Sequence, residues 1–176
     1  QLPKVPTIVT PGNHDVPLYR VHERVLTPYA LYKQYIHEEL DYVLPVETAL
    51  FVSLNSTAPL REITNGRVDP WQLDFADGAF AEATPGIARI IVAHHHFAPA
   101  PDYEGAQVMP DAKTALDRFT QQKVDLILGG HLHRAYIGNS LDVHPGHDRQ
   151  HGVVIVQSGT TTSRRGRARE QAKNSF

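Results

Sequence analysis

Residues 88–133, ARIIVAHHHFAPAPDYEGAQVMPDAKTALDRFTQQKVDLILGGHLH, decide the fold of this chain. Residues 88–93 form an apolar run typical of a buried strand, residues 111–122 have the spacing of a helix, and residues 124–128 form a second apolar run. This order predicts a parallel βαβ unit, whose two strands end at the same edge of one sheet. Histidines follow both strands, so we expect these histidines to meet in space.

Further elements are predicted on both sides of this unit. Residues 7–10, 49–54 and 152–157 are apolar or β-branched runs typical of strands. Thr27-Pro28 and Asp69-Pro70 each place a capping residue before a proline, which predicts the start of a helix. The apolar residues that share one helix face are Leu31, Tyr35, Ile36 and Leu40 after the first start, and Trp71, Phe75 and Ala79 after the second. We expect the second set to pack into the core.

Three short motifs that contain histidine each follow a predicted strand. They are Gly12-Asn13-His14-Asp15, His94-His95-His96 and Gly130-His131-Leu132-His133. Imidazole nitrogens and an amide oxygen delivered from several strand ends can hold a first-row divalent cation, and open α/β sheets bind ligands at such ends. Taken singly, the first motif is equally typical of a turn capped by its Asn and Asp. The third has an exposed loop as its alternative, but the strongly apolar strand and the double glycine before it favour a site.

Spacing narrows the choice of ligands within two of these motifs. His131 and His133 are two residues apart, so an extended backbone would project both rings to one side, within reach of adjacent metals. Three consecutive histidines cannot all face one ion. His94 and His96 share a side in extended backbone, so both stay open as the ligand.

Other basic residues are interpreted as surface groups. His144, His147 and His151 lie around Pro145-Gly146, which prevents a helical metal pair, and His22 and His37 lie in a helical region. Residues 163–176 form a basic tail segment that we expect to be solvated. Its arginines are Arg164, Arg165, Arg167 and Arg169.

Composition fits one globular domain over residues 1–176. Of 176 residues, 41% are hydrophobic and 20% are charged, which is ordinary for a chain with a packed core. The net charge of -2 does not indicate a nucleic-acid partner. The absence of cysteine excludes disulfides and thiolate-bound zinc. No apolar run is long enough to span a bilayer, so we expect no membrane association and a cytoplasmic location.

In their order, the three motifs resemble those of the calcineurin-like metallophosphoesterases. The pattern of that family runs D-x-H, G-D, G-N-H-[DE], a histidine after a strand, and G-H-x-H. The last three match here, whereas neither of the first two precedes them in a chain that opens at Gln1. The resemblance implies an α/β fold, a four-layer α/β/β/α sandwich with two facing sheets, and we expect its N-terminal strand–helix portion to be missing from these residues.

The resemblance also implies a role for each motif. Asn13, His94 and His131 would bind one metal, and His133 would bind a second together with the upstream aspartate and histidine. His96 stays the alternative to His94, and His14 would be the catalytic partner that protonates the leaving oxygen. The cofactors would be two divalent ions of manganese, iron or zinc.

Two alternative functions are compatible with this resemblance. The first is hydrolysis of a phosphoester substrate, with phosphodiesters favoured, by a water activated at the dinuclear metal site. The second is a noncatalytic binding or scaffold module that keeps the fold with an incomplete metal site, because the two upstream motifs are absent. The sequence does not choose the substrate, the metal, the oligomeric state, or whether these residues alone are active.

Overall fold

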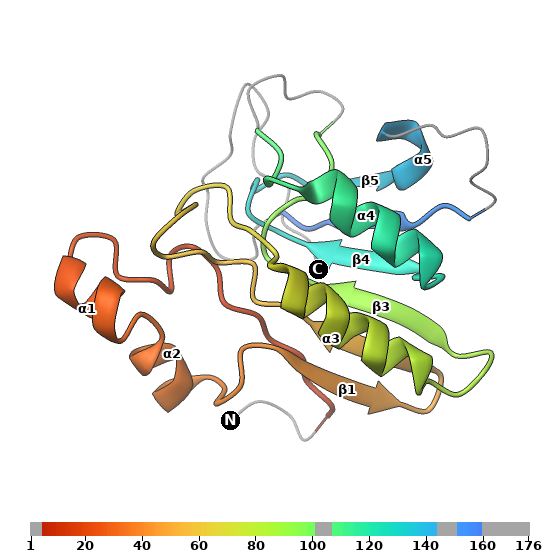
Figure 1. The fold of residues 1–176 in the computed structure, drawn as a ribbon, viewed down its shortest axis with the longest axis horizontal. Coiled ribbons are helices and arrows are strands. Elements are labelled where there is room, and N and C mark those ends of the chain that lie inside the picture. Colours follow the sequence, from red (N-terminus) through yellow and green to blue (C-terminus); the bar gives the residue numbers. More distant parts are fainter. Residues whose placement is uncertain (1–4, 101–106, 144–150, 160–176) are drawn as a thin grey trace.

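The computed structural model describes residues 5–100, 107–143 and 151–159, and these residues build one six-stranded sheet with helices (Figure 1). The elements in chain order are α1 (Val21–Leu26), α2 (Ala30–Tyr35), β1 (Tyr42–Val46), β2 (Ala49–Ser53), α3 (Pro70–Ala81), β3 (Ala88–Val92), α4 (Ala112–Gln121), β4 (Leu126–Gly129), β5 (Tyr136–Asn139), α5 (Ser140–Val143) and β6 (Val154–Gln157). The predicted α/β class is confirmed. Of the two facing sheets that the resemblance implies, the described residues form one.

The sheet is parallel at its centre and antiparallel at its edges. Its strand order is β1-β2-β3-β4-β6-β5. Strands β2, β3, β4 and β6 are parallel neighbours, with Ile91 opposite Ile127 in the β3–β4 pair. The predicted βαβ unit is therefore confirmed. Because parallel strands end at the same edge, the segments that follow β2, β3 and β4 emerge side by side.

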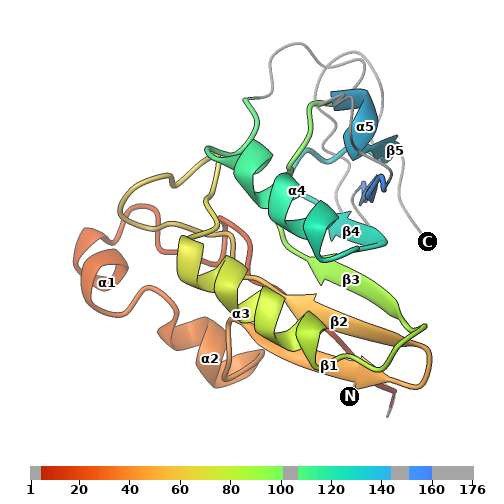
Figure 2. The same cartoon turned by 45° about the vertical axis from the view of Figure 1, so that its right-hand side comes forward.

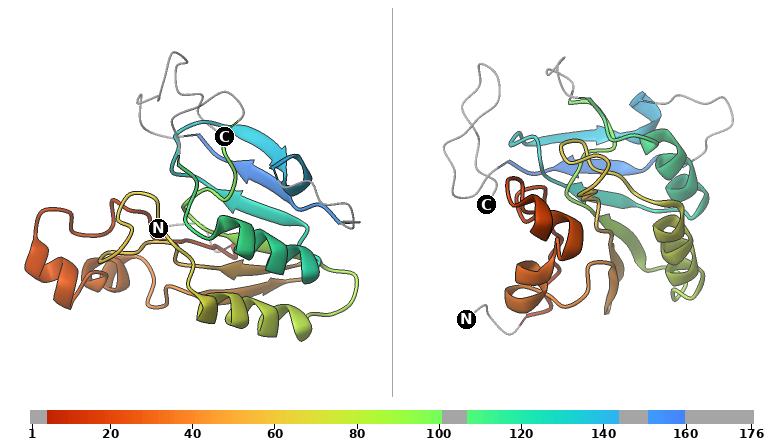
Figure 3. Two further views of the ribbon diagram at one scale, coloured as in Figure 1. Left: turned by 45° about the horizontal axis from the view of Figure 1, so that its top comes forward. Right: turned by 60° about the vertical axis from the view of Figure 1, so that its left-hand side comes forward.

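Helices α3 and α4 cover one face of the sheet, while α1 and α2 lie on the other side (Figure 2 and the right panel of Figure 3). The core lies between the sheet and α3 and α4, where Phe80, Leu116 and Phe119 pack against Ile91 and Ile127. Full burial of such a side chain stabilises the fold by about 1.5–3 kcal/mol. This packing fixes the parallel strands and therefore their carboxyl ends. No helix among the described residues has the length and apolarity needed to cross a bilayer.

Three predictions near the amino end were wrong. Residues 7–10 are not a strand, because the hydroxyl of Tyr42 bonds both backbone groups of Val9, at 2.7 Å from its nitrogen and 2.9 Å from its oxygen. Thr27-Pro28 does not begin one long helix but separates α1 from α2. The expected apolar face is also wrong, since Leu31, Tyr35 and Ile36 are exposed and Tyr32 is the buried residue of α2.

The start of α3 was predicted correctly, and its buried face was predicted in part. Asp69 caps the helix in a reciprocal capping box, in which the Gln72 side chain accepts the Asp69 backbone N–H at 2.8 Å. Gln72 then takes a core position, because its amide donates to Asp41 Oδ1 at 2.5 Å and to the Asn55 carbonyl at 2.9 Å. The buried face is turned away from Trp71, which is 57% exposed, whereas Phe75 and Ala79 are partly buried and pack against the core as predicted.

Two edge strands were not predicted. Strand β1 contains Pro45, which is tolerated because an edge strand leaves one row of N–H groups without a ladder partner. Strand β5 is only four residues long and pairs antiparallel with β6. Apolar periodicity did not indicate these strands, because β1 is interrupted by a proline and β5 is short.

Candidate metal centre

The histidine motifs that follow β3 and β4 meet at one edge of the sheet. The backbone keeps pairing past the strands, since Ala93 N–H donates to the Leu128 carbonyl at 3.0 Å and Gly130 N–H donates to the His94 carbonyl at 3.0 Å. The βαβ topology therefore delivers His94 and His131 to the same place, as the sequence predicted. Their ring centroids are 5.2 Å apart.

Asn13 reaches the same point from the loop that precedes α1. His94 Nε2 lies 3.1 Å from Asn13 Oδ1 and 3.3 Å from His131 Nδ1. This approach requires a glycine at position 12, because a Cβ atom there would lie 2.8 Å from His94 Cε1. Asp15 closes the loop by accepting the Gly12 backbone N–H at 2.8 Å. The motif is thus both a turn held by its aspartate and a means of presenting Asn13.

The donor set fits a divalent cation. Ligand atoms that share one ion at about 2.1 Å lie roughly 3.0–3.4 Å apart, for octahedral and tetrahedral arrangements respectively. The distances from His94 Nε2 to Asn13 Oδ1 and to His131 Nδ1 fall in this interval. Burial lowers the pKa of His94 to about 4, with Asp15 opposing the shift, so the imidazole is neutral at pH 7 and keeps a lone pair for a metal.

His95 belongs to the same cluster, and sequence reasoning did not select it. Ligand atoms of His94, His95 and His131 lie within 4.8 Å of one another. His95 Nδ1 is 2.9 Å from Ser56 Oγ, while His95 Nε2 is buried and has no hydrogen-bond partner among the described residues. With Nδ1–H donating to Ser56, Nε2 would present a lone pair. Burial lowers the pKa of His95 to about 2, which keeps the ring neutral.

A glycine also makes room for His95. Gly66 has φ +69°, and a Cβ atom there would lie 2.2 Å from His95 Nδ1 and 2.4 Å from the Ser56 carbonyl oxygen. The Ser56 hydroxyl in addition accepts the His95 backbone N–H at 3.0 Å. Strand alternation would turn His95 away from His94, but the backbone bends at both residues. These contacts are long-range, so the sequence carried no signal for them.

The remaining histidines of the two motifs, His96 and His133, are not part of the cluster of His94, His95 and His131. The His96 ring is buried and stacks on that of His131 with centroids 5.7 Å apart. Asn13 contacts His94, which supports His94 over His96 as the ligand. The expectation of extended backbone at His131 and His133 was wrong, because their φ angles are +68° and +56°. The chain turns here to bury Leu132, and half-buried His133 lies outside the cluster of His94, His95 and His131.

His14 lies next to Asn13 and lines a cavity that the candidate ligands Asn13, His94 and His131 do not line. Its exposed side chain lines a cavity of about 320 Å³ between the Gly12-Asn13-His14-Asp15 loop and helices α1 and α2. Buried Tyr32 lines the same cavity. His14 is therefore placed beside the candidate ligands, on an open side from which a substrate could approach.

The other basic residues do not join this centre within the described residues. The His151 ring donates to the Val124 carbonyl at 2.7 Å, and the His37 ring stacks on Tyr42 at 4.1 Å. His22 is exposed beside Glu23. His144, His147 and the basic tail segment of residues 163–176 lie outside the residues that the structure describes.

Comparison with known proteins identifies the class to which this fold and site belong. Residues 1–135 match the family model of the calcineurin-like phosphoesterases, and the chain is a member of that family. A solved structure of PhoD is similar to it with a TM-score of 0.49 and 11% identity, over 69% of this chain and 29% of the PhoD chain. The chain thus spans less than a third of the length of that protein. No curated protein matches it.

Proposed function

We propose that the protein hydrolyses a phosphoester, with phosphodiesters favoured over monoesters, at a dinuclear metal centre. Asn13, His94 and His131 would hold one divalent ion, and His133 would contribute to the second. The observation that carries the proposal is the convergence of Asn13 Oδ1, His94 Nε2 and His131 Nδ1 from three separate segments. Membership of the calcineurin-like phosphoesterase family supports it.

The metal ions would supply an acidified water as nucleophile and neutralise charge on the phosphoryl oxygens. Manganese, iron and zinc all suit a set of imidazole and amide ligands. The protein would contribute neutral imidazoles, because burial keeps His94 and His95 unprotonated at pH 7. The Ser56 hydroxyl would orient the His95 ring through its bond to Nδ1.

His14 would handle the proton of the leaving group. It follows Asn13 directly and is exposed to the cavity beside α1 and α2, so it would meet the leaving oxygen of an ester that extends from the metal centre into this cavity. An imidazole in this place would donate a proton to the departing alkoxide or stabilise its charge. The loop that presents His14 is held by the bond from Gly12 N–H to Asp15.

The test combines metal content with turnover. Aryl phosphate monoesters and diesters are offered with added manganese, and bound metal is measured in the parent and in His131→Ala and His14→Ala variants. We expect His131→Ala to lose metal, and His14→Ala to keep metal while turnover falls by about 10²- to 10⁴-fold. His151→Ala is the matched control, because His151 bonds to Val124 away from the centre. Unchanged metal in His131→Ala, or parental turnover in His14→Ala, would contradict the proposal.

A further inference from the structure

A second cavity, of about 270 Å³, opens between α1, the segment that follows β2 and the first turn of α3. Asn55 and Thr57 line it, and they flank Ser56, whose hydroxyl contacts His95. The Arg67 backbone N–H donates to the Ser56 carbonyl at 2.8 Å, which brings a third lining residue to the same wall. This cavity therefore lies at the carboxyl end of β2, next to the end of β3 that presents the histidine cluster.

One wall of the cavity is aromatic, and its tryptophan is not packed into the core. Trp71, the chain's one tryptophan, lies in the first turn of α3 and is 57% exposed. Trp71 does not pack into the core, because α3 buries the face that contains Gln72 and Leu73 instead. Tyr29 lines the cavity as well, and its hydroxyl lies 2.7 Å from Thr57 Oγ1, which ties the start of α2 to the segment after β2. The cavity thus offers a fixed aromatic surface to a planar group.

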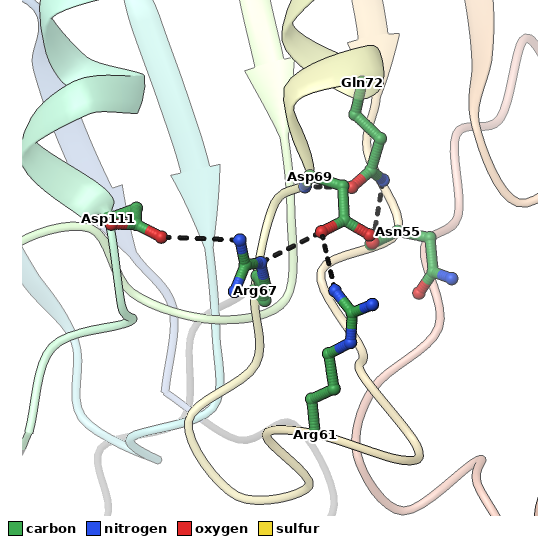
Figure 4. Close-up of polar contacts among 6 residues, drawn as sticks. All are labelled: Asn55, Arg61, Arg67, Asp69, Gln72 and Asp111. Carbon is green, nitrogen blue, oxygen red and sulfur yellow. Dashed lines mark hydrogen bonds and ion pairs between the residues drawn. The ribbon is translucent and has the colours of Figure 1, made fainter.

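The lining also has an excess of positive charge. Arg24, Arg61 and Arg67 line the cavity, with Asp69 as the one carboxylate among the lining residues. Figure 4 shows that the two guanidinium groups of Arg61 and Arg67 share this carboxylate, at 3.9 Å and 2.9 Å, while Arg67 also reaches Asp111 at 3.6 Å.

The arginines retain unused donors. The Arg24 Nε atom is buried and has no hydrogen-bond partner among the described residues, although its Nη1 donates to the Leu18 carbonyl at 2.9 Å. The Arg61 side chain is 70% exposed, and among the described residues its ion pair is the long contact to Asp69. An incoming anion could therefore bond to the exposed Arg61 without breaking the short Arg67–Asp69 pair, and the Arg24 guanidinium would add a second positive charge from the cavity wall.

From these observations we infer that this cavity binds an aromatic anion, with its ring against Trp71 and its negative group facing Arg61 and Arg24. The assignment of this ligand to the organic part of the phosphoester substrate rests on the proposed function. It is supported by Asn55 and Thr57, which line the cavity on either side of Ser56, the residue whose hydroxyl contacts His95. A net positive lining favours an ester that keeps a second negative charge near its aromatic group.

Binding can be measured directly because Trp71 is the chain's one tryptophan and lies in the cavity. The full chain is titrated with benzenesulfonate while tryptophan fluorescence is recorded, with methanesulfonate and benzyl alcohol as the anion-only and ring-only probes. We expect saturable quenching by benzenesulfonate and at least about tenfold weaker binding of the other two probes. Equal affinity for all three probes, or no saturable response to benzenesulfonate, would overturn the inference.

Variants locate the anion within the cavity. Arg61→Ala and Arg24→Ala are each expected to weaken benzenesulfonate binding by about three- to tenfold. Arg20→Ala is the matched control, since Arg20 lies outside this cavity and pairs with Glu23 at 3.0 Å. Far-ultraviolet circular dichroism and thermal melting check that each variant is folded. Parental affinity in both Arg61→Ala and Arg24→Ala would place the probe elsewhere and contradict the assignment.

A comparison of esters separates this inference from the proposed function. Trp71→Ala should raise the KM for phenyl phosphate by several-fold more than the KM for methyl phosphate. Equal effects on the two esters would remove the substrate assignment while the proposed hydrolysis stands. If neither ester is hydrolysed but benzenesulfonate still binds in a manner that depends on Arg61, the proposed function is contradicted. The aromatic-anion site would then remain.

Discussion

His94 Nε2 lies 3.1 Å from Asn13 Oδ1, although 81 positions separate the two residues in the chain. The contact joins the loop before α1 to the end of β3 and defines the candidate metal centre more directly than any single motif does. A side-chain amide oxygen and an imidazole nitrogen at this distance can act together on one ion.

Replacement of Asn13 should therefore weaken metal binding without unfolding the protein. We expect Asn13→Ala to lower the affinity for manganese or zinc by at least about tenfold, as measured by competition with a chelator. Asn65→Ala is the matched control, because half-buried Asn65 lies away from the centre and its amide donates to the Gln107 side chain. Equal metal affinity in Asn13→Ala and the parent would remove Asn13 from the ligand set.

Ser56 should act on the centre through His95. Both residues are fully buried, and Ser56→Ala removes the partner of His95 Nδ1 and of the His95 backbone N–H. An unsatisfied buried polar group costs about 1–3 kcal/mol, so the free energy of unfolding should fall by that amount in urea titrations. Thr7→Ala, which removes an exposed bond to the Val5 carbonyl, should change it by less than about 0.5 kcal/mol. A similar effect of the two substitutions would show that Ser56 does not support His95.

The sequence predicted the meeting of His94 and His131 because local patterns were sufficient for it. Two apolar strands joined by a helix must be parallel, and parallel strands present their ends together. The place of His95 in the histidine cluster depends on its contacts with Ser56 and Gly66, which are distant in sequence. The periodicity of apolar residues does not indicate such contacts. Trp71 was misplaced for a related reason, since the core position of Gln72 depends on its bonds to Asp41 and Asn55.

Gly66 is expected to be far less tolerant of alanine than Gly86. Both have positive φ, +69° and +89°, so both substitutions carry a conformational cost of about 1 kcal/mol. A Cβ atom at Gly66 would in addition meet His95 Nδ1 at 2.2 Å, whereas nothing lies within 4 Å of a Cβ atom at Gly86. Thermal melting should therefore show a larger loss of stability in Gly66→Ala than in Gly86→Ala. Equal losses would show that His95 moves freely away from this position.

Asp41 should make the stability of the protein depend on pH. Burial raises the pKa of Asp41 above its ordinary value of 3.8, although the bonds from the Gln72 amide and the Asn55 N–H oppose the shift. A carboxyl whose pKa is raised in the folded state contributes stability below 3.8 and loses that contribution as pH rises through the folded pKa. Asp41→Asn keeps an oxygen that can accept the Gln72 and Asn55 donors but cannot ionise.

We therefore expect the stability of the parent to fall relative to Asp41→Asn as the pH is raised from below 3.8 toward neutrality. Urea unfolding at a series of pH values measures the difference, and Glu38→Gln, which changes an exposed carboxylate, is the control. A difference between the parent and Asp41→Asn that grows in favour of the parent as pH rises would mean that ionised Asp41 stabilises the fold. In that case its bonds to Gln72 and Asn55 would outweigh its burial.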